Sequence, residues 1–229
     1  MTTKAGVKVE PGKLILTSRV GINADLFPDV LRLYVPEGSV VADVTWGKGV
    51  FWQNVDVTKY VLHATDMSTG TDARKLPYAD GSHRAVVLDP PYIYNPKDTV
   101  KASISQPYQV NQSTGFRTVH EVLTFYKEAM FEAKRVLTPD GVLIVKCQDQ
   151  IMSGKQCWMH VEIQRMGEKL GLYLEDLFVL VQKTQPTSRW PTQYHGRKNH
   201  SYFMVFSGDK RAAFPLADDD DDSACQATG

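Results

Sequence analysis

The four residues Asp89-Pro90-Pro91-Tyr92 constrain the fold of this chain most, because they directly follow the apolar run Ala85-Val86-Val87-Leu88. A short apolar run that ends at turn-forming residues predicts a buried strand, here one that delivers a carboxylate to its carboxyl end. The residue before a proline favours extended backbone, and each proline removes an N–H donor. We therefore expect a rigid corner at the edge of the sheet where open α/β folds bind their ligands.

An amino group attached to a flat ring suits this corner. The Asp89 carboxylate and the Pro90 carbonyl would each accept an N–H bond while the ring stacks on Tyr92. Held in this way, the nitrogen lone pair leaves conjugation with the ring and points at an electrophile. The alternative interpretation is a strand-to-loop corner in which the two prolines only end the strand.

A glycine turn follows the first strong strand, which is predicted over residues 39–45. Trp46-Gly47-Lys48-Gly49 leads from this strand into a helix predicted to begin at Val50. The two glycines let the backbone approach a ligand closely. Trp52 stands where the dinucleotide fingerprint has its third glycine, which disfavours a nicotinamide or flavin site.

Two acidic residues follow the next predicted strand, over residues 60–66. Asp66 ends this strand at a suitable distance after the glycines to bind two ribose hydroxyls, and an exposed strand-end aspartate is the alternative. Asp72 follows so soon that we expect the helix between this strand and the strand of Asp89 to be very short or absent.

The glycine turn, the acidic residues and the proline corner, in this order, resemble the catalytic domain of the S-adenosylmethionine-dependent DNA amino-methyltransferases over roughly residues 13–207. The resemblance implies a Rossmann-like α/β class I methyltransferase fold, with a mostly parallel seven-stranded sheet and a C-terminal antiparallel hairpin. It implies catalytic roles for Asp89, Pro90 and Tyr92, and no metal. The cofactor contacts it implies are Asp43, Thr45, Gly47, Gly49, Asp66 and Asp72, where Thr45 replaces the family's usual phenylalanine.

The remaining elements follow from local patterns. An apolar stripe predicts a helix over 23–34 with Asn23 as its cap, and the capping box Thr118 to Glu121 begins another helix. A turn over 138–141 is expected to lead into a strand at Val142. The other predictions are a strand over 13–17, a helix over 158–170, and strands over 174–181 and 202–206.

Two segments are candidates for substrate contact, because the resemblance covers only the catalytic domain and we expect no separate target-recognition domain in this sequence. The polar loop 93–117 follows the catalytic corner, and the loop 184–200 mixes basic and aromatic residues, as contacts to nucleic acid require. A plain solvated hairpin is the alternative for the second loop. Our candidate substrate residues are Tyr94, Arg189, Arg197 and Lys198. A partner subunit that supplies target recognition is a further expectation.

Length and charge fit one domain over residues 1–211, followed by an acidic tail over 212–229 that we expect to be disordered. The 26 basic residues balance 26 acidic ones, but five of the acids form the run Asp218 to Asp222. The body is therefore mildly basic, which suits a nucleic-acid partner. No apolar run is long enough for a membrane span, and three unpatterned cysteines suit a reducing cytoplasm.

The expected reaction is methyl transfer to a base amine in DNA. A leading Asp in the tetrapeptide favours adenine N6, while cytosine-N4 enzymes more often begin with Ser. An RNA base amine is the main alternative. An inactive methyltransferase-like subunit is disfavoured because Asp89, Gly47 and Gly49 are all present.

Overall fold

The structure is a computed structural model, and it describes residues 14–91, 116, 118–152, 154–183 and 192–208. The helices are α1 (Asn23–Tyr34), α2 (Val119–Val136) and α3 (Met159–Lys169), with short 3-10 turns η1 (Val50–Asn54), η2 (Val57–Lys59) and η3 (Met67–Thr69). The strands are β1 (Ser18–Val20), β2 (Val40–Asp43), β3 (Val61–Ala64), β4 (His83–Leu88), β5 (Leu137–Cys147), β6 (Gln150–Met152), β7 (Lys155–Cys157), β8 (Tyr173–Val181) and β9 (His200–Ser207).

Seven of these strands form one sheet in the order β1-β8-β9-β5-β4-β2-β3. Neighbouring strands are parallel except at β9, which runs antiparallel to both β5 and β8. The predicted mostly parallel seven-stranded sheet with a C-terminal antiparallel hairpin is therefore confirmed. Because β2, β4 and β5 lie side by side and parallel, their carboxyl ends meet at one edge of the sheet.

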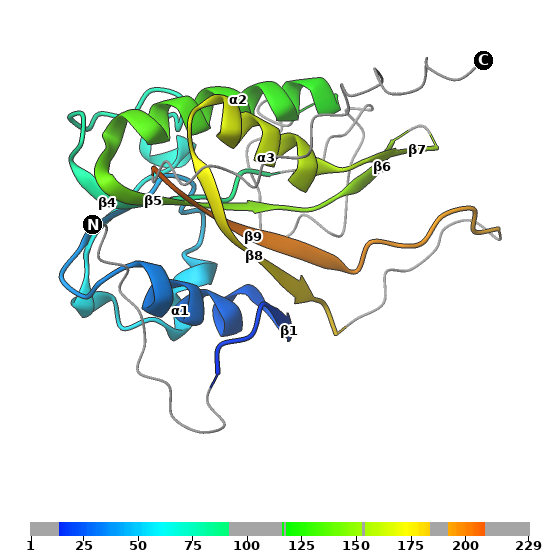
Figure 1. Ribbon diagram of the computed structural model, residues 1–229, viewed down its shortest axis with the longest axis horizontal. Helices are drawn as coiled ribbons and strands as arrows, with labels where there is room; N and C mark the ends of the chain where they lie inside the picture. Colours follow the sequence, from blue (N-terminus) through cyan, green and yellow to red (C-terminus); the bar gives the residue numbers. More distant parts are fainter. Residues whose placement is uncertain (1–13, 92–115, 117, 153, 184–191, 209–229) are drawn as a thin grey trace, which may run out of the picture.

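Helices cover both faces of this sheet (Figure 1). On one face α1 and η1 bury an apolar cluster that includes Phe27, Val87, Ile144 and Phe203. On the other face α2 and α3 bury a second cluster. Alternate residues of the central strands enter the two clusters, so β4 and β5 are apolar on both sides, as strands between two helical layers must be.

Helix α1 contains a proline that would normally leave one helical carbonyl without a donor. Pro28 has no N–H to give to the Ala24 carbonyl four residues earlier. The side-chain amide of Asn54 donates to that carbonyl instead, at 3.1 Å from Nδ2 to O. The bond joins α1 to the end of η1, and η1 begins directly after the glycine turn.

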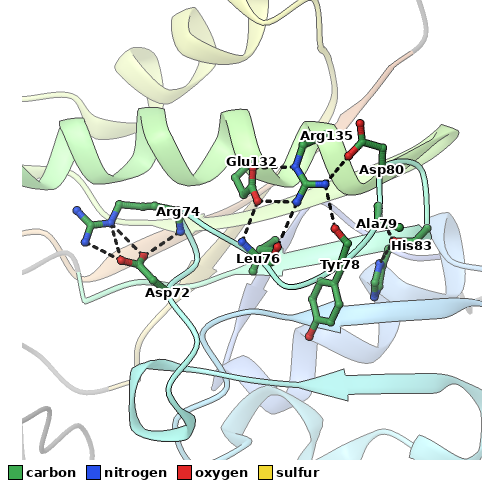
Figure 2. A network of polar contacts seen from close by, with 10 residues as sticks. Asp72, Arg74, Leu76, Tyr78, Ala79, Asp80, His83, Glu132 and Arg135 are labelled. Carbon is green, nitrogen blue, oxygen red and sulfur yellow. Dashed lines mark hydrogen bonds and ion pairs between the residues drawn. The ribbon is translucent and has the colours of Figure 1, made fainter.

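Figure 2 shows how Arg135 of α2 fastens the segment between β3 and β4 to that helix. The guanidinium donates to the carbonyls of Leu76 and Tyr78, at 3.2 and 2.9 Å, and to the carboxylates of Asp80 and Glu132. Glu132 in turn accepts from the Leu76 N–H at 2.8 Å. These bonds fix a segment that has little regular structure, and we call the group the Arg135 clasp.

The structure corrects several local predictions. Ile22, not Asn23, is the N-cap of α1, and the helix predicted at Val50 is only the five-residue turn η1. The first strand lies at 18–20 instead of 13–17. Strand β5 begins at Leu137, because the predicted turn is absorbed by a register shift against β4. The prediction that the helix between β3 and β4 is very short or absent is confirmed, since η3 is the only helical turn between them within the described residues.

The pair β6–β7 was not predicted at all. These two short antiparallel strands follow β5 and extend away from the main sheet (Figure 1). Across the described residues, none of the helices is both long and apolar enough to pass through a membrane. The predicted single-domain boundaries, the acidic tail and the cytoplasmic location stay predictions, and the tail lies outside the described residues.

Candidate active site

The structure brings the two predicted motifs into direct contact. Thr45 follows β2 and Asp89 follows β4, and the Asp89 N–H donates to Thr45 Oγ1 at 2.6 Å although 44 residues separate them. Thr45, which occupies the family's phenylalanine position, therefore ties the proline corner to the strand of the glycine turn. A phenylalanine could not accept this bond.

Asp89 presents a carboxylate oxygen that nothing in the described part of the protein bonds. Its Oδ1 atom is buried and has no hydrogen-bond partner there. Burial raises the pKa of this carboxyl from 3.8 to about 6, while the nearby charge of Lys146 acts in the opposite direction. A buried acceptor without a donor is costly, so such a group is retained where a ligand supplies the donor.

The glycine turn leaves space for a ligand next to its backbone. Gly47 and Gly49 have φ angles of 54° and 64°, in the left-handed region that favours glycine. A β-carbon on Gly49 would stand 2.5 Å from the Trp46 ring, whereas at Gly47 the nearest atom would be 3.9 Å away. Gly49 is thus required for packing, and Gly47 borders open space.

Asp66 closes the other side of this turn. Its Oδ2 atom accepts from the Gly47 N–H at 2.9 Å, and its Oδ1 atom accepts from the N–H groups of Ser68 and Thr69. Partial burial raises the pKa of Asp66, but the hydrogen bonds from Ser68, Thr69 and Gly47 outweigh it and hold that pKa below its ordinary value. Asp66 therefore stays ionised beside the open space at Gly47.

Asp43 lies beneath the turn. Only 4% of Asp43 is exposed, and its carboxylate accepts from Trp52 Nε1 at 2.8 Å and from the Thr45 N–H at 3.1 Å. Burial raises the pKa of Asp43 to about 7, against these two hydrogen bonds and with help from the charges of Asp89 and Asp66. These two bonds join Asp43 to residues on both sides of the glycine turn, so it supports the turn from below.

Asp72 belongs to a different environment, shown in Figure 2. Its carboxylate forms an ion pair with Arg74 at 2.7 Å, and the Arg74 hydrogen bonds lower its pKa. Among the described residues its observed partners lie in its own loop and not in the glycine turn. The role of Asp72 at the cofactor stays a prediction.

Two of the substrate candidates lie within the described residues. Lys198 places its Nζ atom 4.2 Å from the centre of the Trp158 ring, and Arg197 is exposed beside it. His195 Nε2 donates to the Gly154 carbonyl at 2.9 Å, so this segment is joined to the β6–β7 turn. Tyr92, Tyr94 and Arg189 lie outside the described residues.

Two polar groups at the same edge of the sheet were not predicted from the sequence. Lys146 is 2% exposed inside β5, and the signal for it was a lysine in an otherwise apolar strand. The buried carboxylate of Asp149 accepts from Tyr202 at 3.0 Å and contacts His160 Nδ1 at 2.7 Å. No local pattern predicted that these last three residues would meet.

Comparison with known proteins agrees with this geometry. Residues 84–224, more than half of the chain, match the profile of the N6/N4 methyltransferase family, described as DNA methylase. The match begins just before Asp89 and leaves out the glycine turn. No curated protein sequence matches the chain significantly.

Several solved structures are similar to this chain. A candidate methyltransferase of Bacillus halodurans superposes with a TM-score of 0.52 at 16% identity, over 82% of this chain and 99% of that one. A candidate DNA modification methylase of Thermus thermophilus, complexed with S-adenosylmethionine, gives 0.43 at 20% identity over 64% of this chain. The cytosine-N4-specific PvuII DNA methyltransferase gives 0.44 at 17% identity over 61% of this chain.

This chain spans only 56% of the Thermus protein and 48% of the PvuII enzyme. The likeness to the Bacillus protein confirms the class I methyltransferase fold alone. The family profile goes further, because it covers most of the described sheet and includes the proline corner. The chain therefore belongs to the N6/N4 methyltransferase family of DNA methylases.

Proposed function

We propose that this protein transfers a methyl group from S-adenosylmethionine to the exocyclic amino group of a base in DNA, with adenine N6 as the target. The observation that carries the proposal is the buried Asp89 Oδ1 atom, which lacks a donor among the described residues and is tied through Thr45 to the glycine turn. Family membership supports the reaction class. The choice of adenine rests on the leading Asp of the tetrapeptide.

The residues at the glycine turn fit the proposed cofactor. Gly47 borders open space, and the ionised Asp66 beside it supplies an acceptor of the kind that binds ribose hydroxyls. Asp43, Thr45 and Gly49 hold the turn in shape. S-adenosylmethionine, when bound, supplies a methyl group already activated by a sulfonium, so the reaction needs no metal.

The proline corner would position the base. The Asp89 carboxylate accepts one amino N–H, and the Pro90 carbonyl accepts the other, which leaves the nitrogen lone pair free to point toward the methyl group. Tyr92 would stack on a base flipped out of the duplex. Catalysis by these residues is then positioning and electrostatics, and Asp89 accepts the amino N–H most strongly when it is ionised.

The segment around Arg197 and Lys198 would bind the DNA backbone. It is joined to the β6–β7 turn, and neither residues 150–158 nor residues 192–200 contain an acid. Trp158, 48% exposed, adds an aromatic surface under the Lys198 ammonium. Positive charge interleaved with exposed aromatics suits a polyanion that carries flat bases. A partner subunit would extend this surface if the recognition site is long.

Labelled methyl transfer tests the proposal directly. The protein is incubated with methyl-labelled S-adenosylmethionine and either duplex DNA or RNA, and the product nucleosides are separated. We expect label in N6-methyladenine from DNA. Label in N4-methylcytosine would correct the base, and label only in RNA would replace the substrate. Cofactor binding by calorimetry without transfer to either polymer would favour an inactive subunit and refute the proposal.

A further inference from the structure

Lys146 lies beside Asp89 in the sheet. The register of β4 and β5 pairs Leu88 with Val145, so the next residue on each strand is Asp89 and Lys146. Side chains alternate between the two faces of a sheet along a strand. Asp89 is therefore on the same face as Val87, and Lys146 is on the same face as Ile144, which is the face covered by α1. Neighbouring parallel strands therefore place the carboxylate and the ammonium on the same side.

Among the described residues, two aromatic rings flank the ammonium of Lys146. Only 2% of the residue is exposed, and its Nζ atom lies 5.0 Å from the centre of the Phe203 ring and 6.0 Å from that of Phe51. Burial lowers the pKa of Lys146, and the charge of Asp89 opposes that change. A buried ammonium is expensive unless a negative charge accompanies it, so a lysine retained here needs a carboxylate nearby.

Several titratable groups surround Asp89. Asp43 on β2 carries a like charge and is affected by Asp89, and Cys147 is the neighbour of Lys146 on β5. Asp66 acts on Asp43 in turn. Among the described residues, Lys146 is the cation whose charge lowers the pKa of Asp89. The edge thus holds the buried Asp43 and Lys146 together with the partly buried Asp89, and Lys146 adjoins this acid of the proline corner.

We propose that Lys146 is a positioning residue whose buried ammonium keeps Asp89 in the carboxylate form that can accept an amino N–H. The inference rests on the proposed function, because it assigns Asp89 the role of acceptor. Lys146 itself touches no substrate in this account, since it lies below the corner on the α1 face. Without the ammonium, no charge among the described residues opposes the effect of burial on Asp89, and the carboxyl keeps its proton to a higher pH.

The pH dependence of methyl transfer carries the signature of this arrangement. A carboxyl with a pKa of about 6 becomes the stronger acceptor when it loses its proton, so activity of the unmodified protein should rise with pH and level off above roughly pH 7. Removal of the Lys146 charge should raise the midpoint of this pH profile by about one pH unit or more. At pH 9, where Asp89 is ionised even without the ammonium, the variant should regain most of the activity that it lacks near neutral pH.

The test compares Lys146→Met and Lys146→Arg with the unmodified protein. The pH profile of kcat/KM is measured from pH 5.5 to 9, and the Asp89 carboxyl is titrated by NMR in protein labelled with ¹³C at aspartate. We expect both midpoints to rise in Lys146→Met and to stay near the original in Lys146→Arg, which keeps the charge even if it turns over slowly. Val142→Ala, on the same strand and face, controls for lost packing.

An equal loss at every pH in Lys146→Met, with the Asp89 midpoint unchanged, would show that Lys146 only fills space. A shift of the same size in Lys146→Arg would also overturn the inference, because that variant retains the cation. The NMR titration needs no turnover. A protein that fails to methylate any base while its Asp89 midpoint still responds to Lys146 would therefore defeat the proposed function and leave the charge coupling in place.

Discussion

Two regions of this molecule bring acidic and basic side chains near one another, but their acids differ in hydrogen bonding and in the direction of their pKa shifts. In the Arg135 clasp, the guanidinium bonds two carboxylates and two carbonyls, and its hydrogen bonds lower the pKa of Glu132 (Figure 2). At the buried edge, Asp89 keeps an oxygen without a partner among the described residues, and burial raises the pKa of both Asp89 and Asp43.

The difference indicates which acids the fold uses for itself. In the clasp, the Arg135 guanidinium already binds two carboxylates and two carbonyls, so it stabilises a loop and has few donors left for a ligand. A desolvated carboxylate with an open lone pair costs stability and is useful only to something that brings a donor. Both regions contain Asp and a basic residue, so composition alone would not separate them.

The largest expected effect comes from Asp89→Ala. We expect methyl transfer to fall by about 1,000-fold or more, because the variant loses the acceptor that orients the amine. Cofactor affinity, measured by calorimetry, should stay within about threefold, since the Gly47 and Asp66 contacts are untouched. Asp80→Ala in the clasp is the matched control, and its turnover should be unchanged. Retained turnover in Asp89→Ala would contradict the proposed role.

The helices and strands that depend on a local sequence pattern could be predicted from the sequence. Helix α1 was predicted with its observed bounds, and the strands that carry Asp43, Asp66 and Asp89 were found because each apolar run ends at a turn signal. Their order along the chain was sufficient to indicate the family. The β6–β7 pair was missed because three-residue strands of mixed polarity leave no periodic signal.

Contacts that depend on the register between strands could not be predicted from the sequence. Nothing local indicates that the Asp89 N–H bonds Thr45, or that Lys146 adjoins Asp89, because both facts require the pairing of β2 with β4 and of β4 with β5. The start of β5 was misplaced for a related reason. Pro139 predicts a turn, but a shift in the β4–β5 register accommodates it within the strand.

An intermediate effect, on cofactor binding, is expected for substitution of Asp66. This substitution tests whether every well-bonded acid with a lowered pKa only supports the fold. Asp66 is well bonded and has a lowered pKa, as in the clasp, yet we assign it to the cofactor. Asp66→Ala should raise the dissociation constant for S-adenosylmethionine by roughly 10- to 100-fold, from one lost charged acceptor and a loosened Gly47 turn. Binding is measured by calorimetry, with Asp56→Ala as the control.

Asp56 makes a fair control because it caps η2 much as Asp66 caps η3, through a side-chain bond to a backbone N–H. Its loss removes a comparable cap without touching the glycine turn. If both variants bind the cofactor as tightly as the unmodified protein, Asp66 only caps η3 and the cofactor assignment fails. In that case a lowered pKa would mark structural acids throughout this chain.

The smallest effect on catalysis, with a clear effect on stability, is expected for Arg135→Ala. The variant loses the hydrogen bonds to the Leu76 and Tyr78 carbonyls. It also removes the ion-pair partner of the Glu132 carboxylate, whose side chain is 12% exposed. We expect unfolding to become easier by roughly 1–3 kcal/mol, because a half-exposed cluster is partly screened by water. Urea titration measures this change, and Arg135→Lys should recover only part of it.

In the same variant, kcat and the acid limb of the pH profile should match those of the unmodified protein at temperatures where both are folded. The reason is spatial: the clasp anchors residues 76–80 to α2, while Asp89 and Lys146 lie on the α1 face of the sheet. A shifted acid limb in Arg135→Ala would mean that charges on the helix α2 side reach Asp89 through the sheet. The charges of the Arg135 clasp would then affect the pKa of Asp89. In that case the number of hydrogen bonds that an acid accepts would not indicate whether it serves the fold or a ligand.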